Sequence, residues 1–315
     1  MVFNTQESAP GHQGASSTPG NLPATSLVIC SRNRPKLLFE CVQSILQGAE
    51  LPTELCIIDQ SDVEHPSLTA LKTDRACEIR YLWTQSVGLG RARNAGIAAA
   101  RHDILAFTDD DMVVPATWFG SLIRALVDAG RRSIVTGRVL PTAPETPGAF
   151  APSTKIEEVR EVYEGRVGKD VLWAGNMAMY RTVIAGIGAF DERLGVGSRF
   201  PSSEDNDFGF RLLEAGSRII YAPEAVLYHR AWRTKQDHVS IGWSYGRGQG
   251  AYYAKYLSVR DPYMLRRMIS DIIRHVLLFP RRVWREPHRA CGDAVYVFAL
   301  VSGAFEWLLT QPRTR

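Results

Sequence analysis

The sequence predicts an α/β protein with a doubly wound, mostly parallel sheet flanked by helices, followed by a helical C-terminal region. Four apolar runs, 26–31, 54–59, 79–83 and 103–108, have the length and composition of buried strands. Helical patterns alternate with these runs, and one of them, 35–46, starts at a proline and repeats its apolar residues with helical spacing. Such alternation is typical of βαβ units in a parallel sheet.

Composition limits the class of protein. The 315 residues suffice for one large domain, or for one domain with an appended subdomain, and a content of 45% hydrophobic and 22% charged residues is typical of soluble globular proteins. The five cysteines are odd in number and lack paired metal-ligand spacing. Cys30, Cys41 and Cys56 lie in apolar stretches, so we interpret them as reduced core residues, which favours a cytoplasmic location.

The most informative polar residues lie where the fourth predicted strand ends. Thr108 is followed by three consecutive aspartates, Asp109, Asp110 and Asp111. Adjacent carboxylates repel one another unless solvent or a cation absorbs their charge. Because ligands of open α/β sheets bind at the carboxyl ends of the strands, this position suits Mg²⁺ or Mn²⁺ bound to a substrate's phosphates. A solvated acidic turn before the next helix is the alternative interpretation of the triplet alone.

Two other nucleotide-binding patterns are missing from the sequence. The segment Gly88-Leu89-Gly90 is too short for a dinucleotide fingerprint and lacks its third glycine. A P-loop lysine pattern does not occur either. The sequence therefore argues against a dinucleotide-dependent dehydrogenase and against a P-loop enzyme.

A second acidic cluster begins a predicted helix further along the chain. A loop with glycine and proline, 195–203, leads into Glu204, Asp205 and Asp207, and apolar positions with helical spacing follow them. Ser203 is a candidate N-cap for this helix, and acidic residues suit its first turn. Capping explains one or two of these carboxylates, but not three at one helix start.

The segments on either side of this cluster read as strands. Upstream, 171–180 is predicted to be a strand that Gly175-Asn176 interrupts. Downstream, a strand pair at 218–221 and 225–228 ends on His229. A histidine at a strand end is a surface residue or a neutral imidazole ligand, and its own position does not decide between the two.

These residues together resemble the family 2 glycosyltransferases, which have the GT-A fold. The resemblance covers about 26–233 and rests on seven motifs in the family's order. The motifs are Ser31-Arg32-Asn33-Arg34-Pro35, Asp59, the Gly90, Arg93 and Asn94 stretch, the DxD motif 109–111, Gly175-Asn176, Glu204-Asp205 and His229. The resemblance implies a GT-A catalytic domain at 26–235, with a nucleotide-binding half at about 26–112 and an acceptor half at about 113–235.

The resemblance also implies roles for individual residues. A Mn²⁺ or Mg²⁺ ion on the diphosphate would be bound by Asp111, His229 and Asp109 and would stabilise the leaving nucleoside diphosphate. Asp205 is the predicted general base, and Glu204 is the less favoured one. Predicted nucleotide-binding residues are Ser31, Asn33, Arg34, Asp59, Arg93, Asp109 and Asp110. Predicted acceptor-binding residues are Trp173, Gly175 and Asn176, and Trp173 either stacks on the acceptor or packs in the core.

The expected function is therefore inverting transfer of a sugar from a nucleoside diphosphate sugar, UDP-linked by preference, to a hydroxyl of a glycan, lipid-linked or small-molecule acceptor. One alternative is a nucleotidyltransferase that makes sugar nucleotides, which normally has a glycine-rich triphosphate loop after the first strand. The segment 31–35 has no glycine. Another alternative is a non-catalytic protein that binds sugar nucleotides, against which the paired acidic motifs argue.

The two ends of the chain differ in character. Residues 1–25 are rich in Gly, Pro, Ser and Thr, so we expect a disordered leader and no signal peptide. From Arg230 onward, 15 Lys and Arg against 6 Asp and Glu give a net charge of +9, and we expect the basic region 236–315 to be helical.

Within this basic region, 238–257 and the amphipathic 264–278 are predicted helices, and the uncharged stretch 294–305 is too short to span a bilayer. Such helices lie on the anionic inner face of a membrane, as a peripheral contact, or pack on the catalytic domain, and the sequence leaves both interpretations open. Nucleic-acid binding is not expected, since no recognition motif accompanies the charge.

Overall fold

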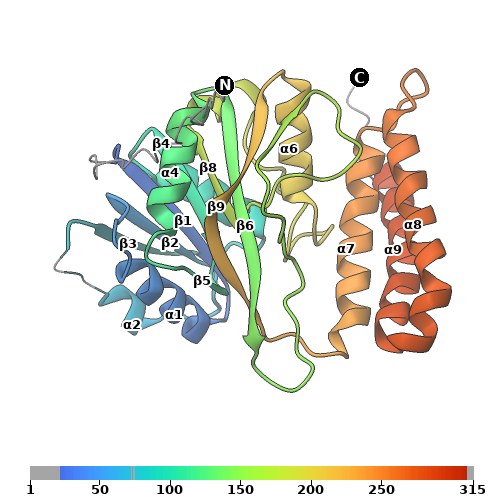
Figure 1. The fold of residues 1–315 in the computed structure, drawn as a ribbon, viewed down its shortest axis with the longest axis horizontal. Coiled ribbons are helices and arrows are strands. Elements are labelled where there is room, and N and C mark those ends of the chain that lie inside the picture. The colour runs from blue at the N-terminus through green and yellow to red at the C-terminus, as the bar shows by residue number, and fades with distance from the viewer. Residues whose placement is uncertain (1–21, 72, 74, 311–315) are drawn as a thin grey trace, which may run out of the picture.

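The computed structural model describes residues 22–310, except residues 72 and 74. The leader predicted at 1–25 therefore lies almost wholly outside the described residues. The α/β fold class is confirmed, because the described residues form a mixed sheet of nine strands with helices on both faces. A group of three C-terminal helices stands beside the sheet domain (Figure 1).

One half of the sheet is parallel. Its strand order is β3-β2-β1-β4, and every pair in it is parallel. The four apolar runs of the sequence become these strands, which are β1 (Thr25–Ser31), β2 (Glu54–Asp59), β3 (Glu78–Trp83) and β4 (Ile104–Asp109). The intervening helices are α1 (Pro35–Leu46), the short α2 (Pro66–Thr69) and α3 (Leu89–Ala99).

The other half of the sheet is mixed. β8 is inserted antiparallel between β4 and β6, β6 runs parallel to β9, and both β5 and β7 pair with β9. The bounds of these strands are β5 (Met112–Val113), β6 (Ser133–Pro144), β7 (Glu161–Glu164), β8 (Asn176–Tyr180) and β9 (Arg218–Ala231). The sequence predicted neither β6 nor β7.

Two predicted strands differ from the observed ones. The strand predicted at 171–180 begins only at Asn176, because the residues before it form a turn. The pair predicted at 218–221 and 225–228 is one continuous strand, β9. Its register against β6 shifts at Gly137/Arg138, so the proline-containing stretch between the two predicted strands forms an irregularity instead of a turn.

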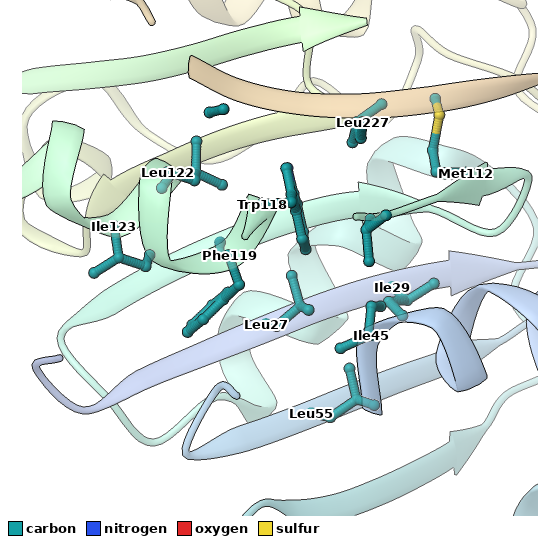
Figure 2. Close-up of a cluster of buried hydrophobic side chains, with 14 of the residues drawn as sticks. Leu27, Ile29, Ile45, Leu55, Met112, Trp118, Phe119, Leu122, Ile123 and Leu227 are labelled. Carbon is teal, nitrogen blue, oxygen red and sulfur yellow. The ribbon is translucent and has the colours of Figure 1, made fainter. Parts of the chain in front are cut away.

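Hydrophobic layers cover both faces of the sheet. Along β1, Leu27 and Ile29 point into a cluster with α1 and with α4 (Trp118–Ala129), as Figure 2 shows with Ile45 and Trp118 on the same side. The alternate residues of β1 point to the opposite cluster, which contains side chains of α3, α5 (Thr182–Ile187) and α6 (Glu204–Glu214). Burial on both faces explains the uninterrupted apolar strands.

The C-terminal region forms α7 (Asp237–Lys255), α8 (Tyr263–Arg285) and α9 (Pro287–Thr310). Glycines let α7 lie against α9, since β-carbons on Gly242, Gly246 and Gly250 would overlap backbone carbonyls of α9. The sequence predicts an apolar segment, 294–305, that is too short to span a bilayer, and this length was wrong. The segment belongs to a helix of 24 residues, which is long and apolar enough to cross a membrane by length and composition.

Candidate functional site

A cavity of about 650 Å³ lies at the carboxyl ends of β1 and β4, at the sheet edge where the sequence predicts a ligand site. The start of α6 and residues of α7, α8 and α9 also contribute to its walls. The predicted site residues that line it are Ser31, Asn33, Arg34, Arg93, Asp109, Asp111, Trp173, Gly175, Glu204, Asp205 and His229. The structure therefore brings together motifs that are up to about 200 residues apart in the sequence.

The loop after β1 is fastened to the loop after β2. Asn33 has a positive φ of 56°, its N–H donates to Ser61 Oγ at 2.8 Å, and its side-chain amide donates to Asp62 Oδ2 at 2.9 Å. Asp59 is fully buried below this loop, where it accepts hydrogen bonds from the Ser61 N–H at 2.9 Å and from the Tyr81 hydroxyl at 2.7 Å. Asp59 thus shapes the loop, and its side chain does not line the cavity.

The acidic triplet divides between the cavity and the interior. Asp110 points inward, where Ser31 Oγ donates to it at 2.6 Å and Arg34 Nη2 lies 2.7 Å away. Burial raises the pKa of Asp110 to about 7, although Arg34 acts against this shift. Asp109 and Asp111 line the cavity instead. This alternation separates the three carboxylates that the sequence places side by side.

Asp111 and His229 lie side by side in the cavity wall, with 3.5 Å between Asp111 Oδ2 and His229 Nε2. The pairing of β5 with β9 fixes this juxtaposition, because Met112 is opposite His229 in the register. His229 Nδ1 lies 2.9 Å from the carbonyl oxygen of Ser153. In the neutral ring this hydrogen bond places the proton on Nδ1 and leaves the Nε2 lone pair available to a metal, whereas in the protonated ring Nε2–H faces the Asp111 carboxylate.

Asp111 and His229 each stabilise the charged form of the other. Burial acts to raise the pKa of Asp111, but hydrogen bonding and attraction to His229 and Arg34 outweigh burial and lower it. Burial acts to lower the pKa of His229, and the Asp111 carboxylate outweighs burial and raises it. Within the described residues, no group of three or more His, Cys, Asp or Glu is arranged to hold a metal. Asp111 and His229 are the two groups that converge here, and a cation held by them would need further oxygen ligands from elsewhere.

Arg93 connects the two acidic motifs. It is only 3% exposed, and its Nη1 donates to Glu204 Oε1 at 2.7 Å while its Nη2 donates to Asp109 Oδ1 at 3.0 Å. The sequence predicts that this arginine binds the nucleotide; in the structure its guanidinium pairs with two protein carboxylates and also lines the cavity. Gly175 lies against the same Asp109 carboxylate, which a β-carbon at this position would overlap.

Asp205 is the second residue of α6, and its half-buried carboxylate lines the cavity. Its Oδ1 accepts a hydrogen bond of 2.9 Å from the backbone N–H of Asn206. Burial, followed by repulsion from Glu204, raises the pKa of Asp205 to about 8, with Arg93 acting in the opposite direction. A carboxylate of this pKa is matched to proton abstraction near neutral pH.

The helix start that bears Asp205 is tied to the C-terminal helices. Ser203, predicted as a side-chain cap, makes no capping bond and has a positive φ of 69°. Its hydroxyl instead donates to Gln249 Oε1 at 2.7 Å, and Asn206 donates to the same oxygen at 2.9 Å. Gln249 Nε2 donates to Asp170 at 2.8 Å, and Arg267 donates to Asp170 at 2.6 Å. Gln249 is therefore a positioning residue for the start of α6.

Replacing Gln249 with leucine is expected to lower kcat by about tenfold or more, because residues 203–206 lose their shared acceptor and Asp205 loses its fixed position. The affinity for the nucleotide that the sequence predicts as a ligand should change little. Isothermal titration calorimetry and the pH profile of kcat/KM separate this effect from a loss of folded protein. A matched control is Gln236→Leu, which changes an exposed glutamine next to α7. A variant with an unaltered rate and profile would contradict the positioning role.

Two further predicted contacts lie in different surroundings. Asn176 is fully buried, accepts a hydrogen bond from Trp118 Nε1 at 2.9 Å, and donates to the backbone carbonyls of Arg138 and Ala225. Asn176 therefore links β8 to its neighbours, and its side chain does not line the cavity. Trp173 is half-buried in the cavity wall, with Lys155 Nζ 5.4 Å from its ring centroid.

The family model described as "Glycosyl transferase family 2" matches residues 26–187. The chain belongs to glycosyl transferase family 2. It is 27% identical over 212 residues to the pre-mycofactocin glycosyltransferase of Mycobacterium tuberculosis, a match that covers 59% of the chain but only 38% of that relative. The chain thus spans well under half the length of this relative.

Solved structures show that this family 2 chain has the GT-A fold. The mannosyltransferase PcManGT from Pyrobaculum calidifontis, in complex with GDP-Man and Mn²⁺, superposes with a TM-score of 0.61 at 14% identity, covering 93% of the chain and 89% of that structure. GalNAc-T7 with UDP, GalNAc and Mn²⁺ gives a TM-score of 0.52 at 16% identity, covering 77% of the chain and 53% of that structure.

Sequence reasoning missed several cavity residues of this family 2 chain. Trp232 donates from Nε1 to Asp111 at 3.3 Å, three residues after the predicted histidine. Gln60 accepts a hydrogen bond from the Gly88 N–H at 3.1 Å and so joins the second strand end to the start of α3. A further group of missed residues comes from the C-terminal helices, which carry no local motif. They include Tyr245, Gln249, Asp271, Arg274 and Tyr296.

Proposed function

We propose that this family 2 chain transfers a sugar from a nucleoside diphosphate sugar to an acceptor hydroxyl, with inversion at the anomeric carbon. UDP is the proposed nucleotide, a glycan, a lipid-linked sugar or a small molecule is the acceptor, and Mn²⁺ or Mg²⁺ is the cofactor. The observation that supports this proposal most is the placement of Asp205, with its raised pKa, in the same cavity as Asp109 and Asp111. One cavity thus holds both a candidate base and a candidate site for a metal-bound diphosphate.

The cofactor proposal rests on the donor atoms at the end of β4. Asp111 Oδ2 and His229 Nε2 converge, and the carboxylate of Asp109 lines the same cavity. A carboxylate, an imidazole and substrate phosphates form an acceptable ligand set for Mn²⁺ or Mg²⁺. When bound, such an ion acts as a Lewis acid that stabilises the charge of the departing diphosphate. Arg34, which donates to Asp111 at 3.1 Å, holds that carboxylate in place.

The proposed roles at the start of α6 follow from the surroundings of each carboxylate. Asp205 accepts the proton of the acceptor hydroxyl as its oxygen attacks the anomeric carbon, which breaks the bond to the nucleoside diphosphate. Direct displacement by that oxygen inverts the configuration. Glu204 is held by Arg93 and is therefore less available as a base. It fixes the electrostatic environment of Asp205 instead.

Donor hydrolysis and transfer provide the test of this function. The chain is incubated with UDP-sugars and with GDP-mannose, with Mn²⁺, with Mg²⁺ or with EDTA, and release of the nucleoside diphosphate is measured. We expect slow metal-dependent release of UDP, and NMR of a transfer product should show the inverted anomer. Formation of a sugar nucleotide from a nucleoside triphosphate and a sugar phosphate would identify a nucleotidyltransferase. Tight binding of UDP-sugars without any turnover would identify a non-catalytic binding protein.

A further inference from the structure

The solvent-facing side of α8 is apolar over most of its length. Eight large apolar side chains on this helix are between 38% and 89% exposed. They are Leu265, Ile269, Ile273, Val276, Leu277, Phe279, Val283 and Trp284. Spacings of three and four residues place most of them on one face of the helix. Two charged residues of α8, Arg267 and Asp271, are buried instead. An ordinary surface helix buries its apolar residues and exposes its charged ones.

Unpaired cations flank this apolar face. Arg267, Arg274 and Arg282 form ion pairs with aspartates of the protein. Arg266, Arg281 and Arg285 are exposed, and they make no ion pair with any residue in the described part of the chain. The helix therefore offers a large apolar surface with positive charge beside it and with few acidic groups nearby.

The neighbouring helix extends the exposed apolar area. On α9, five large apolar side chains are between 42% and 68% exposed, namely Phe298, Val301, Phe305, Leu308 and Leu309. α8 and α9 lie next to each other at the end of the molecule farthest from β3 (Figure 1). Exposed apolar areas of this extent mark an interaction surface, because soluble monomers rarely expose large contiguous patches.

We propose that the apolar face of α8, together with the exposed side of α9, docks on the surface of an anionic lipid bilayer. The apolar side chains enter the boundary between head groups and acyl chains, and Arg266, Arg281 and Arg285 contact the lipid phosphates. A second copy of the chain is a poorer occupant. In a two-fold dimer the same arginines meet one another across the interface, where like charges repel.

The contacts of α9 argue for surface docking and against a transmembrane span. Gly292 and Gly303 of α9 lie against backbone of α7, so the two helices are closely paired. Asp293 accepts from Arg282 of α8, and Glu306 accepts from Arg199 and Arg247. Crossing the bilayer would break these pairs and place two carboxylates in hydrocarbon, which is costly.

Sedimentation with lipid vesicles tests the docking surface on the full-length chain. Sucrose-loaded vesicles of phosphatidylcholine with phosphatidylglycerol are compared with vesicles of phosphatidylcholine alone. We expect binding to the anionic vesicles that weakens as salt is added. The double variants Leu277→Ser/Trp284→Ser and Arg281→Glu/Arg285→Glu should each lower the partition coefficient by about tenfold or more. These side chains are exposed, so circular dichroism should show an unaltered melting temperature.

Matched controls and contrary outcomes keep the test decisive. Val63→Ser/Val159→Ser removes apolar side chains that are 70% and 72% exposed on the sheet domain, and it should leave binding unchanged. Absence of binding to anionic vesicles at low salt would overturn the proposal, as would equal loss in the control. A dimer in light scattering that the Leu277/Trp284 variant abolishes would assign the face to self-association. Resistance to extraction by alkaline carbonate would overturn surface docking in favour of an integral span.

Discussion

Replacing Asp205 with asparagine is expected to lower the rate of sugar transfer by about 10² to 10⁴ while the affinity for UDP changes little. Asparagine keeps the shape of the side chain and cannot accept the proton of the acceptor hydroxyl. Transfer rates and calorimetric titration with UDP measure the two effects on one variant. A matched control is Asp237→Asn, which changes an acidic residue in the first turn of α7.

The pH dependence of the same variant provides a second readout. The folded pKa of Asp205, about 8, lies above the value of about 3.9 for an unfolded aspartate. The folded state therefore binds this proton more tightly, and the wild-type protein loses stability as the pH rises from about 4 to about 8. The asparagine variant lacks this loss, so its melting temperature relative to wild type should increase over the same range. Wild-type kcat/KM should rise with pH towards a plateau above pH 8. In the variant, kcat/KM should not show this rise.

An asparagine variant that transfers sugar at a near wild-type rate would exclude Asp205 as the base. The candidate would then be Glu204, which lies beside it and is paired with Arg93. If Asp205 only stabilises the start of α6, a different pattern is expected. In that case Asp205→Asn would shift the melting temperature slightly and leave transfer intact, because asparagine suits a helix start about as well as aspartate.

Replacing Asp111 with alanine is expected to abolish turnover and to weaken the binding of UDP in the presence of Mn²⁺. The variant removes the carboxylate that faces His229, so the metal-bound diphosphate loses a ligand on the protein. With EDTA in place of Mn²⁺, wild type and variant should bind UDP with similar affinity. Calorimetry in both buffers measures this difference. Unchanged affinity and unchanged metal dependence in the variant would show that Asp111 does not bind the cation.

Two further variants separate metal binding from folding. Asp111 also accepts hydrogen bonds from Arg34 and Trp232, so alanine at this position can disturb the loop after β1. Asp111→Asn keeps a side-chain oxygen for these donors and loses the negative charge, and it should show the same loss of metal dependence. Asp62→Ala changes an exposed carboxylate near the same loop and should leave the metal dependence of UDP binding intact.

The strands and the acidic motifs could be predicted because their causes are local. β1 to β4 are buried on both faces, so each appears in the sequence as a short apolar run with polar residues at its end. The rule that ligands bind at strand ends then placed Asp109 and Asp111 at the cavity. β6 escaped prediction, because its second half is a partly exposed strand that contains prolines.

Other parts of the site depend on contacts between residues far apart in the chain. Arg93 and Glu204 are 111 residues apart, and no spacing rule reveals that the arginine pairs with this carboxylate. Asn176 belongs to a family motif, yet its side chain satisfies backbone groups inside the sheet. The length of α9 was missed for a similar reason. Asp293 interrupts the apolar pattern of the sequence, while in the structure Arg282 compensates its charge.

The bridge made by Arg93 couples events on the two sides of the cavity. One guanidinium binds Asp109 and Glu204 at once, and its positive charge also lowers the proton affinity of Asp205. On the proposed function, a donor complex that competes for Asp109 would alter this charge distribution, and donor binding would then be coupled to protonation of Asp205. Such coupling is reciprocal: protons shift the donor affinity as much as the donor shifts the proton affinity. If the donor withdraws Asp109 from Arg93, less of the guanidinium charge is neutralised, so the proposed base would hold its proton less tightly in the donor complex, and donor would be expected to bind before acceptor.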